Sequence, residues 1–400
     1  MCPSFRATRE ESHTTRARAN TLRELITHPR TKKIYDQREI LEVLDTCVSC
    51  KACKSECPSN VDIARFKAEF LQQHYDVCGV PMKAFLIARL TEIQRLGTIL
   101  PWFYNAIVRN RMTGNMLKRV LHFAPKRTIP TLYKTTLKHW LGRYRQKNRA
   151  ETVRKVFLFA DEFTNYMDVE IGIKMIELLD WLGYEVIIPK HVESGRTSIS
   201  KGMLKVAKGV ARENVLLLKD LVTENIPLVG IEPSCILSFR DEYPDLVGED
   251  LKEEAVRLGK NCLLYDEFFI REIRAGRIQA EQFTDQPLKI MLHGHCHQKS
   301  LASVEPSREM LSLPVNYSVE VIPSGCCGMA GAFGYEKKHY ELSMKIGEQV
   351  LFPAVRGAGE NVCISAPGTS CRQQIKDGTG KQALHPIEVL YEALKCTKEK

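Results

Sequence analysis

The N-terminal part of this chain is organised around one stretch, Cys47-Val-Ser-Cys50-Lys-Ala-Cys53-Lys-Ser-Glu-Cys57-Pro58. Spacings of two residues let a tight loop turn three thiolates toward one small object, and the fourth cysteine, followed by proline, turns away from them. The pattern predicts the ligands of a [4Fe–4S] cluster. A zinc knuckle or a set of buried thiols is the alternative, but zinc sites more often use two separated C-x2-C pairs.

A second Cys-Pro pair, Cys2-Pro3, opens the chain. In two-cluster ferredoxins, the closing Cys-Pro of one cysteine run completes the cluster that the other run holds. Cys2 is therefore expected to join Cys47, Cys50 and Cys53 on one cluster. Cys57 would serve a second cluster, whose other ligands would lie upstream of Cys2. On this interpretation the sequence is either the C-terminal piece of a longer protein or a chain that lacks the second cluster. The alternative for Cys2 is a disordered terminal thiol.

The composition is that of an ordinary globular protein. The chain has 400 residues, of which 44% are hydrophobic and 26% charged, a length that suggests two or three domains. We find no apolar run of transmembrane length and no signal peptide. Fourteen cysteines in C-x2-C and Cys-Cys arrangements indicate metal ligands in a reducing compartment rather than disulfides. We expect a cytoplasmic protein that is able to lie on the inner face of the cytoplasmic membrane.

Positive charge is concentrated in residues 81–150. This segment has fifteen Lys or Arg and one acidic residue, Glu92, so that it carries +14 of a net charge of +10 and the rest of the chain carries −4. Apolar residues recur in it at helical spacing, together with Trp102. Such a segment suits an anionic lipid surface or an acidic redox partner. A solvated pair of basic helices is the alternative. Nucleic acid is not expected, because no nucleic-acid-binding motif occurs.

The pattern of apolar residues divides the chain into four expected domains: a helical [4Fe–4S] domain (1–80), a basic helical linker (81–150) and two α/β units (151–285 and 286–400). A helix is expected over residues 64–73, with Asn60 or Asp62 as its cap. Beyond residue 153, strands (156–160, 184–189, 227–231) alternate with helices (170–182, 201–218), which favours a parallel sheet. The expected fold class is α+β overall.

The two α/β units are related as an internal repeat. Val156 and Lys289 of the first strands lie 133 residues apart, as do Gly195 and Gly328; Cys235 and Cys371 lie 136 residues apart. A nearly constant offset indicates a duplicated unit. The ends of the strands in each copy would then face a shared cleft, where open α/β sheets bind their ligands.

The second copy carries a further group of cysteines, in the segments His295-Cys296-His297-Gln-Lys299, Gly325-Cys326-Cys327-Gly328 and Gly368-Thr-Ser-Cys371-Arg372. Thiolates with nearby imidazoles suit an iron–sulfur cluster or zinc, so Cys296, Cys326, Cys327 and Cys371 are candidate ligands of a second metal site. Cys235 of the first copy is a further candidate. A structural cysteine cluster without metal is the alternative. His295 and His297 are expected to support the site rather than to ligate.

Together these motifs resemble the iron–sulfur C-terminal half of FAD-linked oxidases of the D-lactate or D-2-hydroxyglutarate dehydrogenase type. They are also similar to the iron–sulfur subunits of glycolate oxidase and of anaerobic glycerol-3-phosphate dehydrogenase, and the duplicated part resembles the CCG domains of heterodisulfide reductase. Two departures stand out. Glu193-Ser194-Gly195 replaces the first Cys-Cys-Gly, and a single Cys371 replaces the final C-x-x-C.

The resemblance implies an electron-transfer subunit or fragment, a component of an oxidoreductase whose flavin site is not in this chain. It would relay electrons from a flavoprotein D-2-hydroxyacid dehydrogenase (lactate, glycolate or 2-hydroxyglutarate type) to a quinone or similar acceptor. FAD is expected only on a partner or a preceding segment. The alternative is a heterodisulfide-reductase-like enzyme that acts on a disulfide or quinone at Cys296, Cys326, Cys327 and Cys371. The sequence assigns no catalytic residue.

Overall fold

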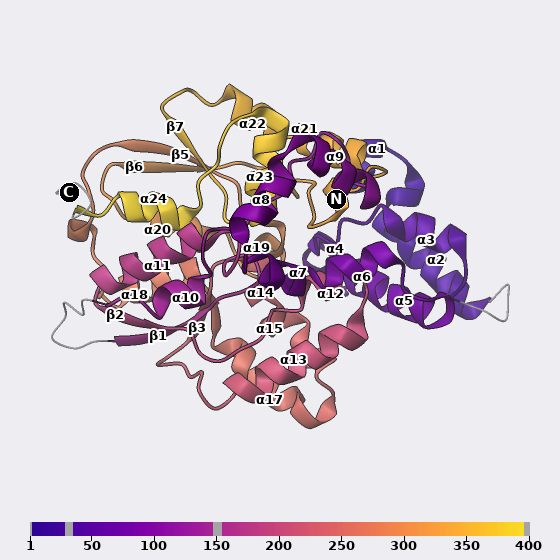
Figure 1. Ribbon diagram of the computed structural model, residues 1–400, viewed down its shortest axis with the longest axis horizontal. Helices are drawn as coiled ribbons and strands as arrows, with labels where there is room; N and C mark the ends of the chain where they lie inside the picture. The colour runs from indigo at the N-terminus through magenta and orange to yellow at the C-terminus, as the bar shows by residue number, and fades with distance from the viewer. Residues whose placement is uncertain (1, 29–34, 147–153, 396–400) are drawn as a thin grey trace.

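The computed structural model describes residues 2–28, 35–146 and 154–395. Every regular element in residues 2–28 and 35–146 is a helix, and two separate parallel sheets follow (Figure 1). The chain is therefore mixed α/β, with helix as its main component. None of the described helices is long and apolar enough to cross a membrane. The expected domain boundary at residue 150 lies within 147–153, outside the described residues.

Helix α4 (Ala52–Glu56) lies within the Cys47–Cys57 stretch, and four helices flank that stretch in the chain: α1 (Pro3–Thr8), α2 (Thr15–Thr27), α3 (Arg38–Asp45) and α5 (Ile63–Cys78), with a 3-10 turn at Glu11–His13. The cap of α5 is Asp62, whose side chain accepts a hydrogen bond from the backbone N–H of Arg65. Asn60, the other expected cap, lies before the helix with a positive φ of 53°. Helix α5 is longer at both ends than the expected 64–73.

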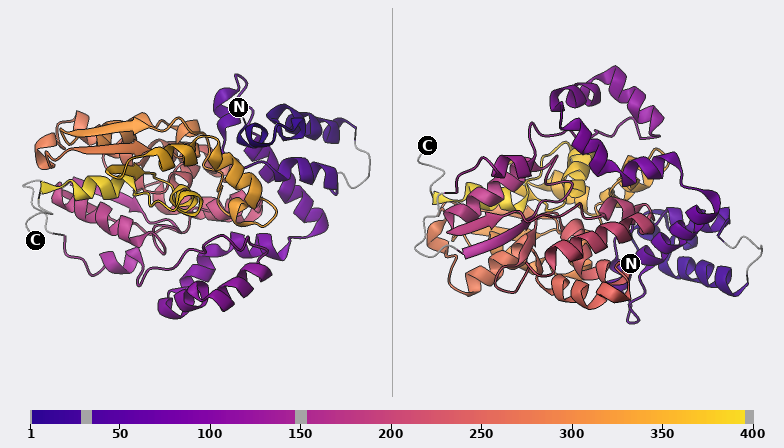
Figure 2. Two further views of the ribbon diagram at one scale, coloured as in Figure 1. Left: turned by 90° about the horizontal axis from the view of Figure 1, so that it is seen from above. Right: turned by 60° about the horizontal axis from the view of Figure 1, so that its bottom comes forward.

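The basic segment forms α6 (Met82–Ala88), α7 (Leu90–Gly97), α8 (Pro101–Arg109), α9 (Arg111–Val120) and the short α10 (Leu137–Leu141). Pro101 occupies the first turn of α8, where its missing N–H has no intrahelical partner to lose. Helices α8 and α9 pack against each other as a hairpin that stands away from the body of the molecule (Figure 2). We refer to α6–α9 as the arm.

The first sheet has strands β1 (Arg154–Phe159), β2 (Tyr184–Ile187), β3 (Leu228–Gly230) and β4 (Cys262–Leu264), in the order β2-β1-β3-β4. All pairs are parallel, with Val156 opposite Val186 and Leu158 opposite Val229. The three expected strands are present, whereas β4 was not predicted. The connecting helices are α11 (Val169–Trp181), α12 (Arg196–Ser200), α13 (Leu204–Leu218), α14 (Pro233–Ile236), α15 (Ser238–Asp241), α16 (Tyr243–Leu246), α17 (Lys252–Lys260) and α18 (Tyr265–Arg274).

The second sheet has strands β5 (Leu288–Leu292), β6 (Tyr317–Val321) and β7 (Val362–Ser365), in the order β6-β5-β7. This is the order of β2, β1 and β3 in the first sheet, and again all pairs are parallel. Its helices are α19 (Cys296–Leu301), α20 (Glu305–Leu311), α21 (Tyr340–Glu348), α22 (Leu351–Gly357), α23 (Thr369–Thr379) and α24 (Pro386–Glu392). Equal strand order in both halves is the topology that a duplicated unit requires.

A layer of helices lies between the two sheets (Figure 1). Helix α24 of the second half packs on α11 of the first, and α18 packs on α20. One buried hydrophobic cluster contains residues of both sheets and of this layer, among them Leu158, Met175, Phe269, Ile290 and Leu390. Helix α19, which follows β5, contacts both α14 of the first half and α4 of the N-terminal region. The shared core therefore fixes the loops at the strand ends against the cysteine stretch.

Candidate metal centre

The loop from Cys47 to Cys53 curls tightly between α3 and α4. Ser49 and Lys51 adopt the left-handed conformation, with φ of 50° and 60°, which residues other than glycine seldom do. The ammonium group of Lys67 donates to the carbonyl oxygen of Cys47 at 2.7 Å and so holds the start of the loop. Strained backbone of this kind persists where the surrounding structure fixes it, commonly at binding sites.

Cys2 is brought to this loop by a buried arginine. The Nη1 group of Arg18 donates to Cys2 Sγ at 3.1 Å, and its Nη2 group donates to Thr46 Oγ1 at 2.8 Å. The hydroxyl of Ser4 also donates to the carbonyl oxygen of Thr46. Burial raises the pKa of the Cys2 thiol, but the Arg18 guanidinium and nearby backbone N–H groups lower it further, so the net pKa lies below the ordinary value. The site therefore favours the thiolate form that iron binds.

Four cysteines line one cavity of about 380 Å³: Cys2, Cys47, Cys50 and Cys53. We call this the cluster cavity. Arg18, Phe5 and Ile63 are also among its lining residues. Three groups of candidate ligand atoms lie within 4.8 Å of one another in the described part of the chain, and none of them includes these cysteines. The four sulfurs therefore surround a space larger than one metal ion requires, which fits a cubane with an iron at each of four corners.

Cys57 does not line the cluster cavity. It follows α4 as its C-cap residue, and hydrogen bonds from the backbone N–H groups of Val61 and Ser59 lower the pKa of its thiol. Of the five cysteines expected near the N-terminal cluster, the structure thus brings four together and leaves Cys57 apart.

The second copy brings its cysteines together at the ends of its strands. Cys296 begins α19, Cys326 and Cys327 lie in the loop after β6, and Cys371 is in the first turn of α23. Cys326, Cys327 and Cys371 are buried, and Cys296 is half-buried. His293, which directly follows β5, is fully buried beside Cys327 and Cys371. We call these five residues the second-copy site.

Hydrogen bonds converge on Cys327. The thiols of Cys326 and Cys371 donate to it and hold the pKa of Cys327 well below its ordinary value. Burial lowers the pKa of His293 to about 4, so its imidazole is neutral at pH 7. The ammonium group of Lys299 lies nearby and donates to the carbonyl oxygen of Ser324 at 2.5 Å. Positive charge and thiol donors together suit a buried thiolate at this position.

The two histidines that flank Cys296 have other partners. His295 caps α19, because its Nδ1 accepts a hydrogen bond from the backbone N–H of His297 at 3.2 Å. The Nε2 group of His297 hydrogen-bonds the carbonyl oxygen of Ser49 at 3.0 Å, in the N-terminal cysteine loop. His293, which the sequence analysis did not single out, is the histidine beside the buried cysteines. Its position directly after the apolar run 288–292, which forms β5, is the signal that could have identified it.

The cluster cavity and the second-copy site are in direct contact. Cys50 and Cys326 share one buried cluster with Val48 and Phe333, and Cys296 packs against it. The hydroxyl of Ser300 on α19 donates to the carbonyl oxygen of Cys50 at 3.2 Å. Burial raises the pKa of the Cys50 thiol, and the neighbouring Cys296 raises it further. Cysteines almost 250 residues apart in the chain thus share one buried environment.

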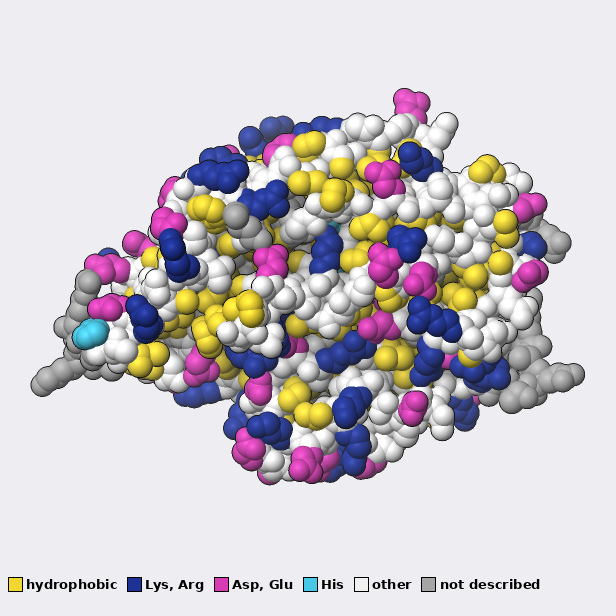
Figure 3. Space-filling view, turned by 180° about the vertical axis from the view of Figure 1, so that it is seen from behind, with side chains coloured by type: hydrophobic (Ala, Val, Ile, Leu, Met, Phe, Trp, Pro, Cys, Tyr) yellow, Lys and Arg dark blue, Asp and Glu magenta, His cyan; other side chains and the backbone are white. Residues whose placement is uncertain are grey.

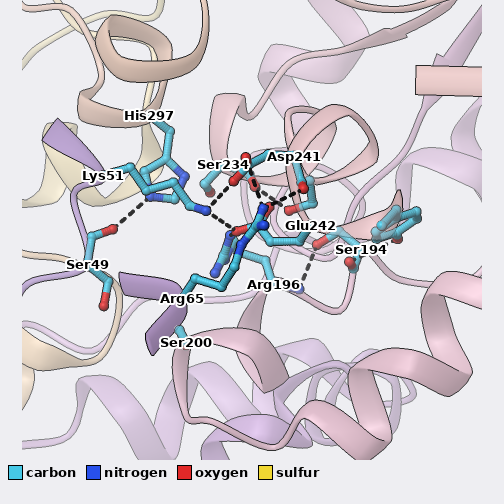
Figure 4. Close-up of polar contacts among 12 residues, drawn as sticks. Ser49, Lys51, Arg65, Ser194, Arg196, Ser200, Ser234, Asp241, Glu242 and His297 are labelled. Carbon is cyan, nitrogen blue, oxygen red and sulfur yellow. Dashed lines mark hydrogen bonds and ion pairs between the residues drawn. The ribbon is translucent and has the colours of Figure 1, made fainter. Parts of the chain in front are cut away.

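A buried ion network anchors the cysteine loop to the first α/β half (Figure 4). Lys51, between Cys50 and Cys53, has a side chain only 3% exposed, and its Nζ atom lies 2.9 Å from Glu242 and 3.3 Å from Asp62. It also pairs with Asp241. Arg196 holds Glu242 from the other side at 2.6 Å. A lysine in a cysteine loop gives no sign in sequence of such a role, since its partners at 241 and 242 are remote.

The equivalent position of the first copy is occupied by side chains that satisfy one another. Asp161, Glu162 and Cys235 lie within 4.8 Å of one another, apart from the second-copy site. Glu162 accepts hydrogen bonds from the backbone N–H and the hydroxyl of Ser194, at 2.9 and 2.7 Å. Burial, with the Glu162 charge, raises the pKa of Asp161 to about 8. Carboxyl groups and a serine stand here where the second copy has thiols.

One protein family matches the N-terminal part of the chain. Residues 1–62 match the family described as "4Fe-4S dicluster domain". The chain carries a 4Fe-4S dicluster domain. It is also homologous to the C-terminal part of D-2-hydroxyglutarate dehydrogenases and is therefore an iron–sulfur electron-transfer region.

The relatives differ in how much of their length this chain covers. D-2-hydroxyglutarate dehydrogenase of Escherichia coli is 25% identical over 99% of this chain, which spans 42% of the length of that protein. A subunit of the anaerobic glycerol-3-phosphate dehydrogenase of Escherichia coli is 26% identical, and the match covers 84% of this chain and 83% of that subunit. Lactate utilization protein A of Bacillus subtilis is 27% identical over 59% of this chain and 98% of its own length.

Proposed function

We propose that this chain relays electrons from a flavoprotein D-2-hydroxyacid dehydrogenase of the lactate, glycolate or 2-hydroxyglutarate type to a quinone or similar acceptor. The observation that carries the proposal is the contact between two cysteine-lined sites, because a relay needs neighbouring redox sites rather than one isolated site. The names of the relatives, two of which are dehydrogenases or dehydrogenase subunits, support the kind of partner.

The cluster cavity would hold a [4Fe–4S] cluster on Cys2, Cys47, Cys50 and Cys53, and such a cluster takes up and releases one electron at a time. Arg18 holds Cys2 in place and provides positive charge beside its sulfur. Val48 and Ile63 keep water from the inner side, since both are buried. Cys57, outside the cavity, would ligate a neighbouring cluster, as the closing cysteine of a dicluster motif does.

A short covalent and hydrogen-bonded path would connect the two sites. From Cys50 it runs through the peptide to the carbonyl oxygen of Ser49, across the hydrogen bond to His297 Nε2, and along the backbone to Cys296, the residue before His297. The hydrogen bond from Ser300 to Cys50 holds the two segments together. The second-copy site would therefore accept electrons from the cluster in the cluster cavity.

The arm supports contact with an anionic membrane surface, where quinones are found. Eleven of its large apolar side chains are exposed, including Ile99 (73%), Trp102 (69%) and Met112 (83%). They lie among basic residues such as Arg95, Arg109 and Arg111. Apolar and basic side chains together bind anionic lipid. The opposite face of the molecule carries Lys and Arg side by side with Asp and Glu (Figure 3).

Two variants test the cluster assignment on the full chain, reconstituted anaerobically with iron and sulfide. Cys47→Ser is expected to abolish the cubane EPR signal of the dithionite-reduced protein, and Cys57→Ser to leave it in place. Equal loss in both variants would contradict the assignment of Cys57 to another cluster. Retention of the signal in Cys47→Ser would overturn the assignment of the cavity.

The relay is tested by mixing the reconstituted chain with an FAD-dependent D-2-hydroxyglutarate dehydrogenase and its substrate, and by following cluster absorbance in a stopped-flow instrument. Bleaching is expected only when the flavoprotein is present, and it should be absent from Cys47→Ser, which is expected to lack the cluster. Absence of flavoprotein-dependent bleaching would count against the proposed electron donor.

Vesicle sedimentation tests the arm: binding to phosphatidylglycerol vesicles is expected to fall when Trp102 and Ile99 are changed to Ser.

A second candidate function, reduction of a disulfide or a quinone at the second-copy site, is favoured by one observation. Cys296 is the least buried cysteine of that site, and hydrogen bonding with Cys326, whose single S–H it shares with Cys327, lowers the pKa of Cys296 to about 7 together with His295 and Lys299. A thiolate at this position would be reactive at neutral pH. Turnover of a disulfide or quinone by the dithionite-reduced chain without any flavoprotein, lost in Cys296→Ser, would support this function.

A further inference from the structure

Buried basic side chains in the described part of the chain differ in whether a carboxylate neutralises them. The buried basic residues are Arg18, Lys51, Arg127 and Arg196. Three of them form ion pairs with buried carboxylates, and Lys51 alone has three such partners. Arg18 is only 1% exposed, yet it forms no ion pair with a carboxylate of residues 2–28, 35–146 and 154–395. A buried charge without an opposite charge is strongly unfavourable, so an anion is expected beside Arg18.

The hydrogen bonds of Arg18 indicate where that anion lies. Its Nε group donates to the carbonyl oxygen of Val43 at 3.2 Å, and Nη2 donates to Thr46 Oγ1 at 2.8 Å. Its Nη1 group donates to Cys2 Sγ at 3.1 Å, and this sulfur is the only one of the three acceptors that can carry a negative charge. Both Cys2 and Arg18 line the cluster cavity. The positive charge of Arg18 is therefore directed at whatever occupies that cavity.

A second unpaired cation lies beside Cys47. The Nζ group of Lys67, on α5, donates to the carbonyl oxygens of Cys47 at 2.7 Å and of Asp45 at 3.4 Å. It forms no ion pair with a carboxylate of the residues that the structure describes. The strongest attraction on this ammonium group comes from the Cys47 thiolate, and the attraction from Asp45 is weaker. The Asp45 carboxylate is bonded instead to His339 and Lys338.

The cluster proposed for the cavity supplies the missing negative charge. A cubane with four thiolate ligands is a dianion when oxidised, and it gains one more negative charge when reduced. Arg18 and Lys67 can offset the charge of the oxidised form, and they attract the reduced form more strongly. Lys51 is also close to the cavity, but its three carboxylate partners cancel its charge. The unpaired cations are thus the ones that distinguish the two oxidation states.

We propose that Arg18 and Lys67 raise the reduction potential of the cluster in the cluster cavity and so favour its acceptance of an electron. Net charge and hydrogen bonds to the sulfurs are among the properties that set such potentials. Arg18 contributes both, whereas Lys67 donates to a carbonyl oxygen and contributes its charge. The inference rests on the cluster assignment in the proposed function and names the groups that poise this cluster to receive electrons.

The test is a redox titration of the full chain, reconstituted anaerobically with iron and sulfide, in which the cubane EPR signal is followed against solution potential. Arg18→Gln and Lys67→Gln each remove one charge and keep an amide donor. At an effective dielectric constant of about 20, a unit charge about 12 Å from the added electron changes the reduction equilibrium about tenfold. Each variant is therefore expected to lower the midpoint potential by at least about 59 mV, the equivalent of tenfold for one electron. The double variant should shift the equilibrium about a hundredfold, because the two side chains share no hydrogen-bond partner.

Three variants serve as controls. Arg16→Gln should leave the midpoint potential unchanged, because Arg16 is on the same helix as Arg18 but is 76% exposed and pairs with Glu11 at 2.6 Å. Arg18→Lys and Lys67→Arg retain the charge and should stay closer to the parent potential than the corresponding Gln variants. Only molecules that hold a cluster give the signal, so partial loss of cluster in a variant does not alter its midpoint.

The outcomes separate this inference from the cluster assignment. A midpoint potential that is unchanged in Arg18→Gln or in Lys67→Gln would overturn the inference for that residue, while the signal itself would still support the cluster. An equal fall in Lys67→Gln and Lys67→Arg would also overturn it, because such a result would indicate a role for the shape of the side chain rather than for its charge. A parent chain without any cubane signal would refute the cluster assignment and the inference together.

Discussion

Replacement of Lys51 by methionine should destabilise the cysteine loop strongly, because it removes the positive charge from a buried network. The Lys51 side chain is 3% exposed, and its ammonium group faces Glu242 at 2.9 Å and Asp62 at 3.3 Å, as well as Asp241. At an effective dielectric constant of about 20, two unit charges about 4 Å apart attract by about 4 kcal/mol. Desolvation of the ions offsets much of this attraction.

The net effect depends on which carboxylates keep a partner. Glu242 retains Arg196 at 2.6 Å, and Asp241 retains Lys54 and Arg65. Asp62 would be left with the hydrogen bond from the backbone N–H of Arg65. Removing one partner of a buried ion pair costs about 3–5 kcal/mol. With two of the three carboxylates still paired, we expect the lower value, about 3 kcal/mol, or roughly 150-fold in the unfolding equilibrium.

The assay is anaerobic urea unfolding of the reconstituted chain, followed by cluster absorbance and by circular dichroism. Lys54→Met is the matched control, because Lys54 pairs with the same Asp241 but its side chain is 26% exposed; we expect about 1 kcal/mol or less there. Lys51→Met/Asp62→Asn should recover part of the loss, since Asn can still cap α5. Equal effects of Lys51→Met and Lys54→Met would refute the reasoning.

Three other variants are expected to have measurable effects. Burial and the Glu162 charge raise the pKa of Asp161 to about 8, so between pH 4 and 8 its carboxyl group is protonated in the folded chain and ionised in the unfolded chain. The free energy of unfolding should therefore fall as pH rises through this window, by up to about 1.4 kcal/mol per pH unit. Asp161→Asn should flatten that slope in urea titrations at pH 5, 6, 7 and 8. Gly368→Ala should reduce metal content at the second-copy site several-fold, since the new Cβ atom would lie 2.5 Å from His295. Gly325→Ala is the control and should not reduce it, because no atom lies within 4 Å of the Cβ position there. Equal metal loss in both variants would contradict the steric argument. Arg18→Met removes the hydrogen-bond donor to Cys2 and should speed the loss of cluster absorbance in air about tenfold, because loss of a hydrogen bond that supports a metal ligand typically lowers metal affinity 10–100-fold. Arg16→Met, at a side chain that is 76% exposed, is the control.

Local sequence predicted the regular elements of this protein because each depends on neighbours in the chain. The apolar runs at 184–189 and 227–231 contain strands β2 and β3, the run at 156–160 overlaps β1, which begins two residues earlier, and Asp62 caps α5. Strand β4 was missed, because Cys262-Leu-Leu264 is too short to distinguish from the surrounding helices. Helix α13 begins three residues later than predicted, at Leu204.

The sequence alone also predicted the cofactor of the N-terminal site. The spacing of Cys47, Cys50 and Cys53 predicts a [4Fe–4S] cluster, and the match of residues 1–62 to a 4Fe-4S dicluster domain supports this prediction. The identity of the remote groups that complete the sites came from the tertiary structure. Lys51 meets Asp241 and Glu242, and Cys50 lies near Cys326, only because the shared helix layer fixes α19 against α4. Such contacts depend on the packing of whole elements, and no short-range pattern encodes them, whereas ligand spacing within one tight loop is a local property that the sequence states directly.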